Sequence, residues 1–406
     1  MSKCLVSNND INPFMSFGKQ PIANGFLNKE SFINEYFFDM EVAFCEESKM
    51  FQLINVPDRE LMFNDTYAFF SGTSNYMAVH FKEFSQDLLA NYINDKNDPF
   101  IVEIGSNDGI MLQNFAKKGI RHLGIEPSAN VANVAKEKGI NTLVDFFDLS
   151  TANRIVTENG KADAFIAANC MCHIPYIDSI VEGIKTLLKS DGVVMFEDPY
   201  LGNVIEHTTY DQIYDEHTFL FSAHSIKYLF NKYDMELIDV KPQTTHGGSM
   251  RYILAHKGAK NISKNVLKIL NKEISLGLHK AETFQKFKSN CEKSKSDFLS
   301  LLKKLKSKGK KVVGYAATSK STTVLNYCKI DSSLIEYICD TTPIKQNKYS
   351  PGMHIPIKPV EYFHNDKPDY AILFAYNHSK EIFEKEKKFT ESGGKWILYK
   401  DKVEII

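Results

Sequence analysis

The chain has 406 residues, a length that suggests two or three domains at about 150 residues each. Hydrophobic residues make up 43% and charged residues 24%, with 49 Lys and Arg against 50 Asp and Glu, so the composition excludes extensive disorder and argues against a nucleic-acid-binding protein. No uncharged apolar run approaches the ~18 residues of a membrane helix, and the first residues lack the apolar segment of a signal peptide, so we expect a cytoplasmic protein without a membrane partner.

The first 85 residues show no long helical period and are expected to be irregular. Within them, Cys4-Leu-Val-Ser7 and Cys45-Glu-Glu-Ser48 have the outline of a zinc knuckle, in which two Cys-x-x-Cys pairs supply four thiolates. Because the second position of each pair is serine, a poor zinc ligand, we expect the module to have lost its zinc. The odd total of seven cysteines does not indicate a disulfide framework.

From Pro99 onward, short apolar segments typical of strands alternate with amphipathic segments typical of helices. This alternation predicts βαβ crossovers and a mostly parallel sheet. Two later strand-like runs, 235–240 and 250–255, have no helix between them and predict an antiparallel hairpin at the sheet edge. The other predicted strands are 100–104, 122–126, 141–144, 163–168 and 193–196, and the predicted helices are 128–138, 177–189 and 221–232.

The last third of the chain predicts a second α/β unit. Residues 260–310 are rich in Lys, Glu, Leu and Phe, lack proline and predict two helices that link two globular units. The second unit begins at 311–320, continues through 334–340 and 370–376, and ends with the strand-like run 396–399.

A glycine loop directly after the first predicted strand is the strongest local signal. It reads Glu103-Ile-Gly-Ser-Asn-Asp-Gly109 and is expected to open a helix, whose N-terminal N–H groups can receive a ligand. Its spacing is Gly-x-x-x-Gly, so a dinucleotide-binding loop is the weaker interpretation. Glu126 ends the next strand about 20 positions later, where a carboxylate can accept both ribose hydroxyls of a nucleoside, although a strand-end glutamate is also often only solvated.

The third predicted strand is followed by Asp145-Phe146-Phe147, which can cover an adenine ring. In combination with the glycine loop and Glu126, this segment predicts S-adenosylmethionine as the cofactor. The expected cofactor-binding residues are Glu103, Gly105, Asn107, Gly109, Glu126, Asp145, Phe146 and Asn169.

Several motifs of the chain resemble those of the deoxysugar C-methyltransferases, which methylate C-3 of a nucleotide-linked 4-keto-6-deoxysugar. The resemblance runs from about residue 4 to 405, and Tyr-Asp-Glu-His at 214–217 is more specific than the glycine loop. The motifs that carry it are 103–109, 168–175, 196–200, 210–217, 246–248, 314–320, 340–343 and 376–378.

The resemblance implies an α/β protein with a class I methyltransferase Rossmann-like core. The expected division is an irregular, zinc-knuckle-like module at 1–75, an S-adenosylmethionine-binding core at 76–258, a helical linker at 259–310, and a C-terminal Rossmann-like α/β domain at 311–406 that helps to bind the sugar nucleotide.

Methylation of a carbon beside a ketone needs a base at that carbon and a hydrogen-bond donor near the ketone oxygen. His217 is the candidate base, because histidine titrates near neutral pH and the family pattern agrees. We expect Glu216 to stabilise the protonated base or hold a sugar hydroxyl, and Tyr214 to donate toward the keto oxygen. His173, after the fourth strand, and Tyr67 are expected to contact the sugar or the enolate oxygen.

Three further residues are expected to bind the substrate, namely His246, Lys320 and Asn377. Lys320 lies at a predicted helix start, where it can neutralise a diphosphate. Cys170 and Cys172 are interpreted as small apolar fillers, and no catalytic metal is expected.

The expected partner is therefore a dTDP-linked sugar nucleotide bound by a monomer, in branched-sugar biosynthesis for a surface polysaccharide or a natural product. One alternative is an O-methyltransferase on the same sugars, which needs a hydroxyl nucleophile and no enolate. Another is a nicotinamide-dependent oxidoreductase or a non-catalytic sugar-nucleotide-binding protein that uses the unit beginning near Gly314.

Overall fold

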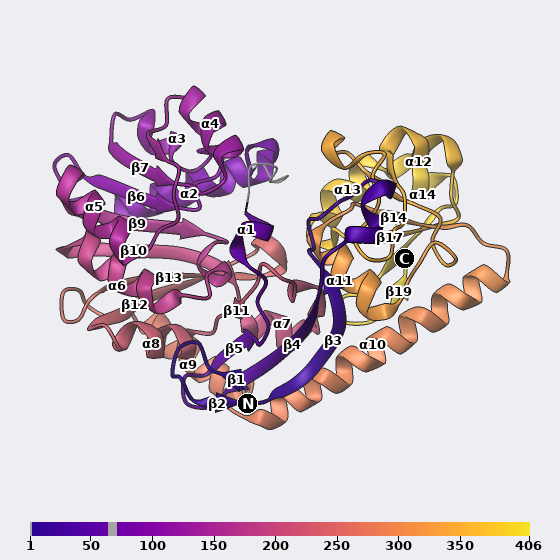
Figure 1. Cartoon of the computed structure of the whole chain (residues 1–406), viewed down its shortest axis with the longest axis horizontal. Helices are drawn as coiled ribbons and strands as arrows, with labels where there is room; N and C mark the ends of the chain where they lie inside the picture. The colour runs from indigo at the N-terminus through magenta and orange to yellow at the C-terminus, as the bar shows by residue number, and fades with distance from the viewer. Residues whose placement is uncertain (1, 64–70) are drawn as a thin grey trace.

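The computed structural model describes residues 2–63 and 71–406 of the chain. Two α/β units lie on opposite sides of the molecule, and an antiparallel N-terminal sheet and the long helix α10 (Ala281–Ser307) run from one unit to the other (Figure 1). No helix in the described ranges combines the length and the apolar character needed to cross a bilayer.

The larger unit is built on a seven-stranded sheet in which β13 alone runs antiparallel to its neighbours. The alternation of short apolar strands with helices therefore gives the parallel sheet that it predicts, and the predicted edge hairpin, formed by β12 and β13, is confirmed. In spatial order the strands are β12 (Met235–Gln243), β13 (Ser249–His256), β10 (Leu188–Pro199), β9 (Ala162–Ala168), β6 (Phe100–Ile104), β7 (Arg121–Ile125) and β8 (Thr142–Leu143).

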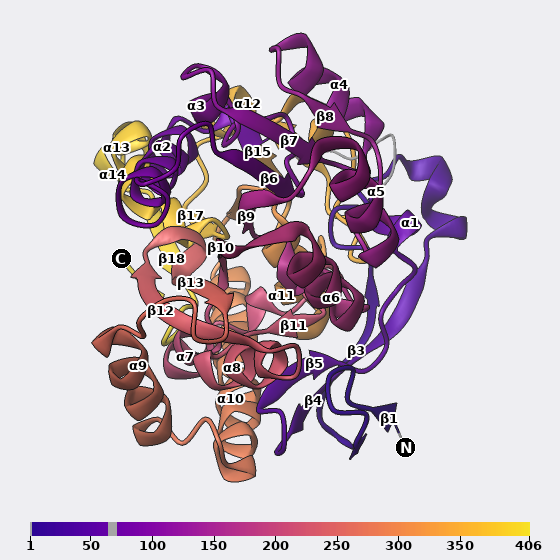
Figure 2. The ribbon, with the colours of Figure 1, turned by 90° about the vertical axis from the view of Figure 1, so that its left-hand side faces the viewer.

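Helices cover both faces of this sheet, as Figure 2 shows from the side of the larger unit. Residues of α2, α3 and α4 pack on one face, and residues of α5, α6, α8 and α9 pack on the other. The helices of this unit and the first linker helix are α2 (Asn75–Asn91), α3 (Gln113–Ala116), α4 (Ala129–Glu137), α5 (Leu149–Asn159), α6 (Ile177–Leu187), α7 (Leu201–His207), α8 (Ala223–Asn231) and α9 (Lys264–Ser275).

Three local expectations for this unit are wrong. The helix expected directly after Gly109 begins only at Gln113, since turns occupy the intervening residues. Residues 188–189, expected to end a helix, instead begin β10, which pairs with β9 through Leu188 and Ala162. Helix α5 was not expected, although Asp148 caps it by accepting a hydrogen bond from the backbone N–H of Thr151 at 2.8 Å.

The N-terminal segment is a sheet rather than an irregular module, contrary to expectation. Phe38, Met40 and Val42 are buried on one face of β4, so the period-two alternation of a strand is present but short. The sheet consists of β3 (Pro13–Pro21), β4 (Phe37–Cys45), β5 (Met50–Leu53) and β11 (Phe219–Leu220), and the segment also contains β1 (Ser2–Lys3), β2 (Asp10–Ile11), η1 (Lys29–Asn34), α1 (Arg59–Met62) and η2 (Ser71–Thr73).

The smaller unit is a six-stranded sheet in which only β19 is antiparallel to its neighbour. The two helices predicted between the units are confirmed as α9 and α10. In spatial order the strands are β16 (Ile357–Pro359), β15 (Ile338–Asp340), β14 (Val312–Tyr315), β17 (Tyr370–Leu373), β18 (Lys395–Leu398) and β19 (Glu404–Ile405), and the helices are α11 (Ser319–Cys328), α12 (Val360–Asp366), α13 (Ser379–Lys385) and α14 (Lys387–Glu391).

One hydrophobic core joins the N-terminal sheet to the smaller unit and to α10. The ring of Phe17 on β3 lies 4.9 Å from that of Tyr327 on α11, and Phe44 on β4 stacks on Phe284 of α10 at 4.1 Å. The N-terminal sheet is thus held against the C-terminal unit by apolar packing, and its loops are positioned relative to both α/β units.

Candidate active site

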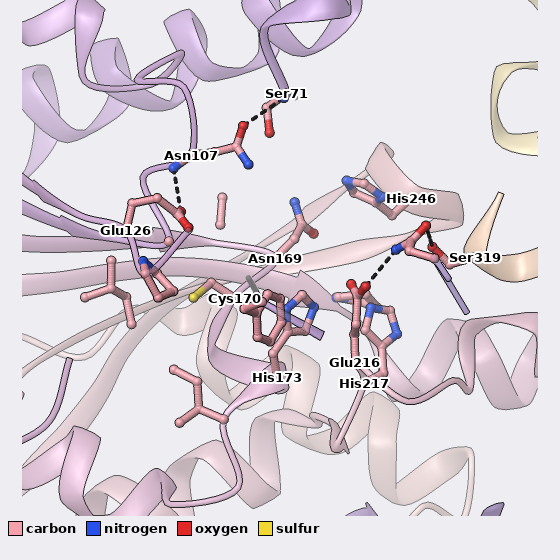
Figure 3. Close-up of a pocket in the computed structure, with 18 of the residues that line it drawn as sticks. Ser71, Asn107, Glu126, Asn169, Cys170, His173, Glu216, His217, His246 and Ser319 are labelled. Carbon is pink, nitrogen blue, oxygen red and sulfur yellow. Dashed lines mark hydrogen bonds between the residues drawn. The ribbon is translucent and has the colours of Figure 1, made fainter. Parts of the chain in front are cut away.

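A cavity of about 300 Å³ lies where the N-terminal segment and both α/β units meet (Figure 3). Its wall from the larger unit follows the carboxyl ends of β6, β7, β9 and β10, at Gly105, Glu126, Asn169 and Pro199. This is the edge at which parallel α/β sheets bind ligands. Lys320 and its neighbours contribute the wall from the smaller unit.

Most of the predicted site residues line this one cavity. They are Gly105, Asn107, Glu126, Asp145, Phe146, Asn169, His173, Tyr214, Glu216, His217, His246, Lys320 and Asn377. Tyr67 lies outside the described residues.

The glycine loop and Glu126 form a rigid end of the cavity. Gly105 has a φ of +60°, and a Cβ atom there would lie 2.6 Å from Sγ of Cys170, so only glycine fits. The carboxylate of Glu126 accepts hydrogen bonds from the backbone N–H groups of Asn107 at 3.0 Å and Ser128 at 2.9 Å. These bonds fix both carboxylate oxygens in the wall and leave each with a lone pair for a ligand hydroxyl.

Two predicted cofactor residues, Glu103 and Gly109, lie behind this wall rather than at its surface. Burial and the nearby carboxylates of Glu126 and Asp108 raise the pKa of Glu103 well above its usual value. Gly109 has a φ of +77°, and a Cβ atom there would lie 2.8 Å from the side chain of Ile140. We therefore assign both residues to support of the loop and not to contact with a ligand.

Phe146 carries a cation on its face that the sequence did not indicate. The guanidinium of Arg59 lies 3.9 Å from the centroid of the Phe146 ring and 5.0 Å from that of Tyr176, and all three side chains line the cavity. Asp145, which precedes Phe146, forms an ion pair with Arg154. No local pattern predicts Arg59 as a site residue, because α1 is distant in sequence from Phe146 and Tyr176 and contacts them only in the folded chain.

Asn169 and Cys170 follow β9 and complete this side. Asn169 has a φ of +51°, and its buried Oδ1 has no hydrogen-bond partner among the described residues. Cys170 lines the cavity and packs against the hydrophobic core of the larger unit, whereas Cys172 is fully buried within that core. Burial raises the pKa of both thiols, which keeps them neutral. An orphaned amide oxygen and a close-fitting glycine are features of a ligand-binding wall.

His217 is held in one tautomer by its two hydrogen bonds. Its Nδ1 lies 2.6 Å from the carbonyl oxygen of Gln212, so we assign the ring proton to Nδ1. The other nitrogen, Nε2, then accepts a hydrogen bond from the hydroxyl of Tyr214 at 2.8 Å. Burial lowers the pKa of His217 well below its usual value, and nearby His173 adds to this effect. His217 is therefore a neutral base at physiological pH.

His173 stacks on His217, with ring centroids 5.3 Å apart and planes inclined by 27°. Burial lowers the pKa of His173 to about 4, and its Nε2 is without a hydrogen-bond partner among the described residues. Side-chain ligand atoms of Cys172, His173 and His217 lie within 4.8 Å of one another in the described part of the chain. Because both nitrogens of His217 are hydrogen bonded and the two rings are stacked, we do not assign this group as a metal site.

The side chain of Glu216 is hydrogen bonded to a residue of the N-terminal segment. Its Oε1 accepts a hydrogen bond from Nδ2 of Asn24 at 2.7 Å, and Oδ1 of Asn24 accepts one from the hydroxyl of Ser319 at 3.0 Å. Burial raises the pKa of Glu216, while the bond from Asn24 and the charge of Lys345 act in the opposite direction. Asn24 and Ser319 line the cavity and were not anticipated.

The smaller unit places a buried lysine at the other end of the cavity. Nζ of Lys320 donates a hydrogen bond to the carbonyl oxygen of His246 at 3.2 Å, and burial lowers the lysine pKa. Thr318 caps the helix by accepting from the backbone N–H of Ser321 at 3.1 Å. Asn377 lies beside them in the wall. A lysine at a helix N-terminus is a suitable arrangement for an anionic ligand.

The four positions of a zinc knuckle meet in space, but they do not supply a zinc ligand set. Sγ of Cys4 lies 3.3 Å from Oγ of Ser48, and Oγ of Ser7 lies 3.3 Å from Sγ of Cys45. A structural zinc ion takes four nitrogen or sulfur ligands, and these four residues offer two sulfurs. The four residues therefore do not fit a structural zinc ion, and no function is derived from zinc.

Three family models match the chain. They describe a methyltransferase domain (residues 77–240), a C-methyltransferase C-terminal domain (residues 244–399) and a proposed zinc-binding domain (residues 4–63). The sheet order, the ligand-binding edge and the methyltransferase-domain match define the larger unit as a class I S-adenosylmethionine-dependent methyltransferase fold.

Comparison with individual proteins is more specific. The chain is 31% identical to the C-methyltransferase NovU of Streptomyces niveus over 386 residues, which cover 95% of this chain and 91% of NovU. A ubiquinone biosynthesis O-methyltransferase of Colwellia psychrerythraea is 30% identical over 109 residues, 26% of this chain and 44% of the relative. A solved S-adenosylmethionine-dependent methyltransferase from Anabaena variabilis covers 43% of this chain and 84% of its own, with 16% identity and a TM-score of 0.36. The chain belongs to the S-adenosylmethionine-dependent C-methyltransferase family.

Proposed function

We propose that this enzyme transfers a methyl group to C-3 of a dTDP-linked 4-keto-6-deoxysugar, in branched-sugar biosynthesis for a surface polysaccharide or a natural product. The observation that carries the proposal is the hydrogen bonding of His217. Its Nδ1 is bound to a backbone carbonyl, so the basic Nε2 faces Tyr214 within the cavity. A buried neutral imidazole beside a phenol is suited to form and stabilise an enolate.

The proton transfer follows from these contacts. Nε2 of His217 removes the hydrogen at C-3, the C–H electron pair moves to the C-4 oxygen, and the imidazole becomes cationic. Tyr214 has one hydroxyl proton, so donating it toward the C-4 oxygen frees Nε2 to receive the substrate proton. The enolate carbon would then form the new C–C bond to the methyl group, whose bond to the sulfonium sulfur would break with its electron pair remaining on the sulfur.

The glycine-loop end of the cavity is proposed to hold S-adenosylmethionine, which supplies an electrophilic methyl group. Glu126 would accept ribose hydroxyls, and Phe146 with Arg59 would lie against the adenine. Oδ1 of Asn169, which lacks a partner in the described part of the chain, is a further acceptor on this side.

The opposite end is proposed to hold the sugar nucleotide. Lys320 would offset diphosphate charge, and His246 and Asn377 would contact the sugar nucleotide from the same wall. A chain with a net charge of -1 needs only such local cations for a small anionic ligand. A monomer is proposed, because the segments that line the cavity all belong to one chain.

The test is hydrogen exchange at C-3 in deuterated water, with His217→Asn as the variant. The expected result is loss of exchange while calorimetry shows unchanged binding of S-adenosylmethionine. Retained exchange would remove His217 from the role of base. Mass spectrometry and NMR with a panel of dTDP- and GDP-linked 4-keto sugars would identify the substrate, and a methyl group on oxygen in the product would contradict C-methylation.

A further inference from the structure

We infer that Asn24 and Ser319 are positioning residues that fix the carboxylate of Glu216 as the acceptor of a hydroxyl group on the sugar. The sugar itself rests on the proposed function, whereas the hydrogen-bond chain is a property of this fold. Asn24 lies after β3, Glu216 lies between the larger unit's η4 (Tyr210–Gln212) and β11, and Ser319 is the first residue of α11.

The direction of the hydrogen bonds from Ser319 through Asn24 to Glu216 follows from which of these groups can donate and which can accept. The Ser319 hydroxyl donates to Oδ1 of Asn24, and the amide nitrogen of Asn24 donates to Glu216. Figure 3 labels Glu216 and Ser319, the two ends of this hydrogen-bond chain. The opposite amide orientation would place Oδ1 against a carboxylate oxygen. The carboxylate of Glu216 therefore selects the orientation in which the amide nitrogen donates to Oε1, and the Ser319 hydroxyl supports that orientation by donating to Oδ1.

The segment around Asn24 is anchored at several points, which makes the arrangement specific. The backbone N–H of Ala23 donates to Oδ1 of Asp215 at 2.9 Å, so residues 23 and 24 bind two consecutive carboxyl side chains. The hydroxyl of Thr322, one turn along α11 from Ser319, donates to the carbonyl oxygen of Ala23 at 2.9 Å. The N-terminal segment is thus held between the loop that carries Asp215 and Glu216 and the C-terminal unit.

Glu216 has acceptor capacity left for a ligand. It is 4% exposed and lines the cavity, and within the described ranges Asn24 is the one residue that donates a hydrogen bond to it. A carboxylate accepts about four hydrogen bonds through its two oxygens. A buried carboxylate with one donor is satisfied best by a donor from a bound ligand, and on a sugar that donor is a hydroxyl group.

The groups that face Glu216 set its titration. They are Asp215 in the same loop, Lys345 of η6 (Pro343–Lys345) and Cys172 of η3 (Met171–His173). Burial raises the pKa of Glu216, and the bond from Asn24 lowers it. Loss of the Asn24 amide therefore raises the pKa of Glu216 further, and this shift is measurable without substrate.

Infrared titration with ¹³C-labelled glutamate tests the hydrogen-bond chain. The Glu216 band is isolated by subtracting a matched Glu216→Gln spectrum in each background. In Asn24→Ala the carboxylate should protonate about one pH unit higher than in the wild type. Ser319→Ala should shift it in the same direction by less, and Ser319→Thr, which keeps the hydroxyl, should restore the wild-type value.

A matched control is Asn55→Ala, which removes an amide of the same N-terminal segment that donates to the carbonyl oxygen of Asp39 at 2.7 Å. This variant should leave the Glu216 titration unchanged. Unchanged titration in Asn24→Ala would overturn the inference. If Asn24→Ala fails to fold in thermal unfolding, Ser319→Ala decides the question, because it keeps Asn24 in place.

Turnover of modified substrates then tests whether Glu216 accepts a hydrogen bond from a hydroxyl group of the sugar. The substrates are dTDP-linked 4-keto sugars that each lack one hydroxyl. The wild type should use one of them, the sugar that lacks the bound hydroxyl, with a kcat/KM lower by roughly tenfold or more than that of the others. Asn24→Ala should lose this discrimination through KM while keeping its affinity for S-adenosylmethionine. A shifted titration with unchanged discrimination would overturn the hydroxyl assignment. A shifted Glu216 titration in Asn24→Ala, with no turnover of any such sugar by the wild type, would support the hydrogen-bond chain and contradict the proposed function.

Discussion

The hydroxyl of Tyr214 donates a hydrogen bond to Nε2 of His217 at 2.8 Å, three residues away in the same loop. This contact joins a weak acid to a neutral base inside the cavity, and the backbone carbonyl of Gln212 fixes the tautomer from the other side. In the proposed reaction the pair would supply both groups that enolate formation requires, a proton acceptor for carbon and a donor for oxygen. Its consequences can be tested one residue at a time.

Tyr214→Phe removes the donor and keeps the ring that packs on His217. We expect kcat to fall by roughly 10²-fold, with C-3 exchange slowed in parallel and the affinity for S-adenosylmethionine unchanged. The control is Tyr362→Phe, because Tyr362 is 45% exposed and lies on α12. Equal exchange rates in Tyr214→Phe and the wild type would show that the phenol does not assist enolate formation.

Gly105→Ala introduces a Cβ atom at a positive φ and 2.6 Å from Sγ of Cys170. Gly119→Ala is the matched control, since Gly119 has a φ of +70° and nothing within 4 Å of the added atom. The conformational cost of about 1 kcal/mol is common to both variants, and the clash should destabilise Gly105→Ala by a further ~1–3 kcal/mol. Urea unfolding measures the difference, and calorimetry should show weaker S-adenosylmethionine binding only in Gly105→Ala.

The buried His173 predicts a change of stability with pH. Its pKa is lowered to about 4 by burial, below the ~6.5 of an exposed histidine. Between these values the unfolded chain binds more protons at this residue, so its contribution to stability is present above about pH 6.5 and is lost as the pH falls toward 4. In urea titrations the free energy of unfolding of the wild type should fall more steeply than that of His173→Asn, by at most about 1.4 kcal/mol per pH unit. Parallel slopes would contradict the burial of a neutral ring.

The Cys–Ser knuckle predicts independence from zinc. EDTA should leave the Tm of the wild-type chain unchanged, because Cys4 and Cys45 are already paired with Ser48 and Ser7. The double variant Ser7→Cys/Ser48→Cys should bind one zinc ion per chain and gain thermal stability that EDTA removes. Ser7→Cys alone, with three thiols, is the control for the added sulfur. Stoichiometric zinc in the purified wild type, measured by elemental analysis, would contradict this prediction.

Local sequence patterns predict the buried parallel strands but not the N-terminal sheet. The sequence predicts the strands near Phe100 and Asp163 because buried parallel strands are short, mostly apolar runs. The N-terminal sheet was missed because its strands alternate over only a few residues and one of them, β11, comes from the middle of the chain. Pairing between segments so distant leaves no periodic signal in either.

The α/β class and the cluster of side chains at the strand ends could be predicted from residue order alone. The carboxyl ends of parallel strands share one edge of a sheet, and residues such as Gly105, Glu126 and Asn169 follow those ends directly. The distant residues that complete the site could be identified only in the folded chain. Asn24 reaches Glu216 across 192 positions and Ser319 across 295, through apolar packing of the N-terminal sheet on the C-terminal unit. Hydrogen bonds of this range depend on how whole units pack, and no local spacing encodes them.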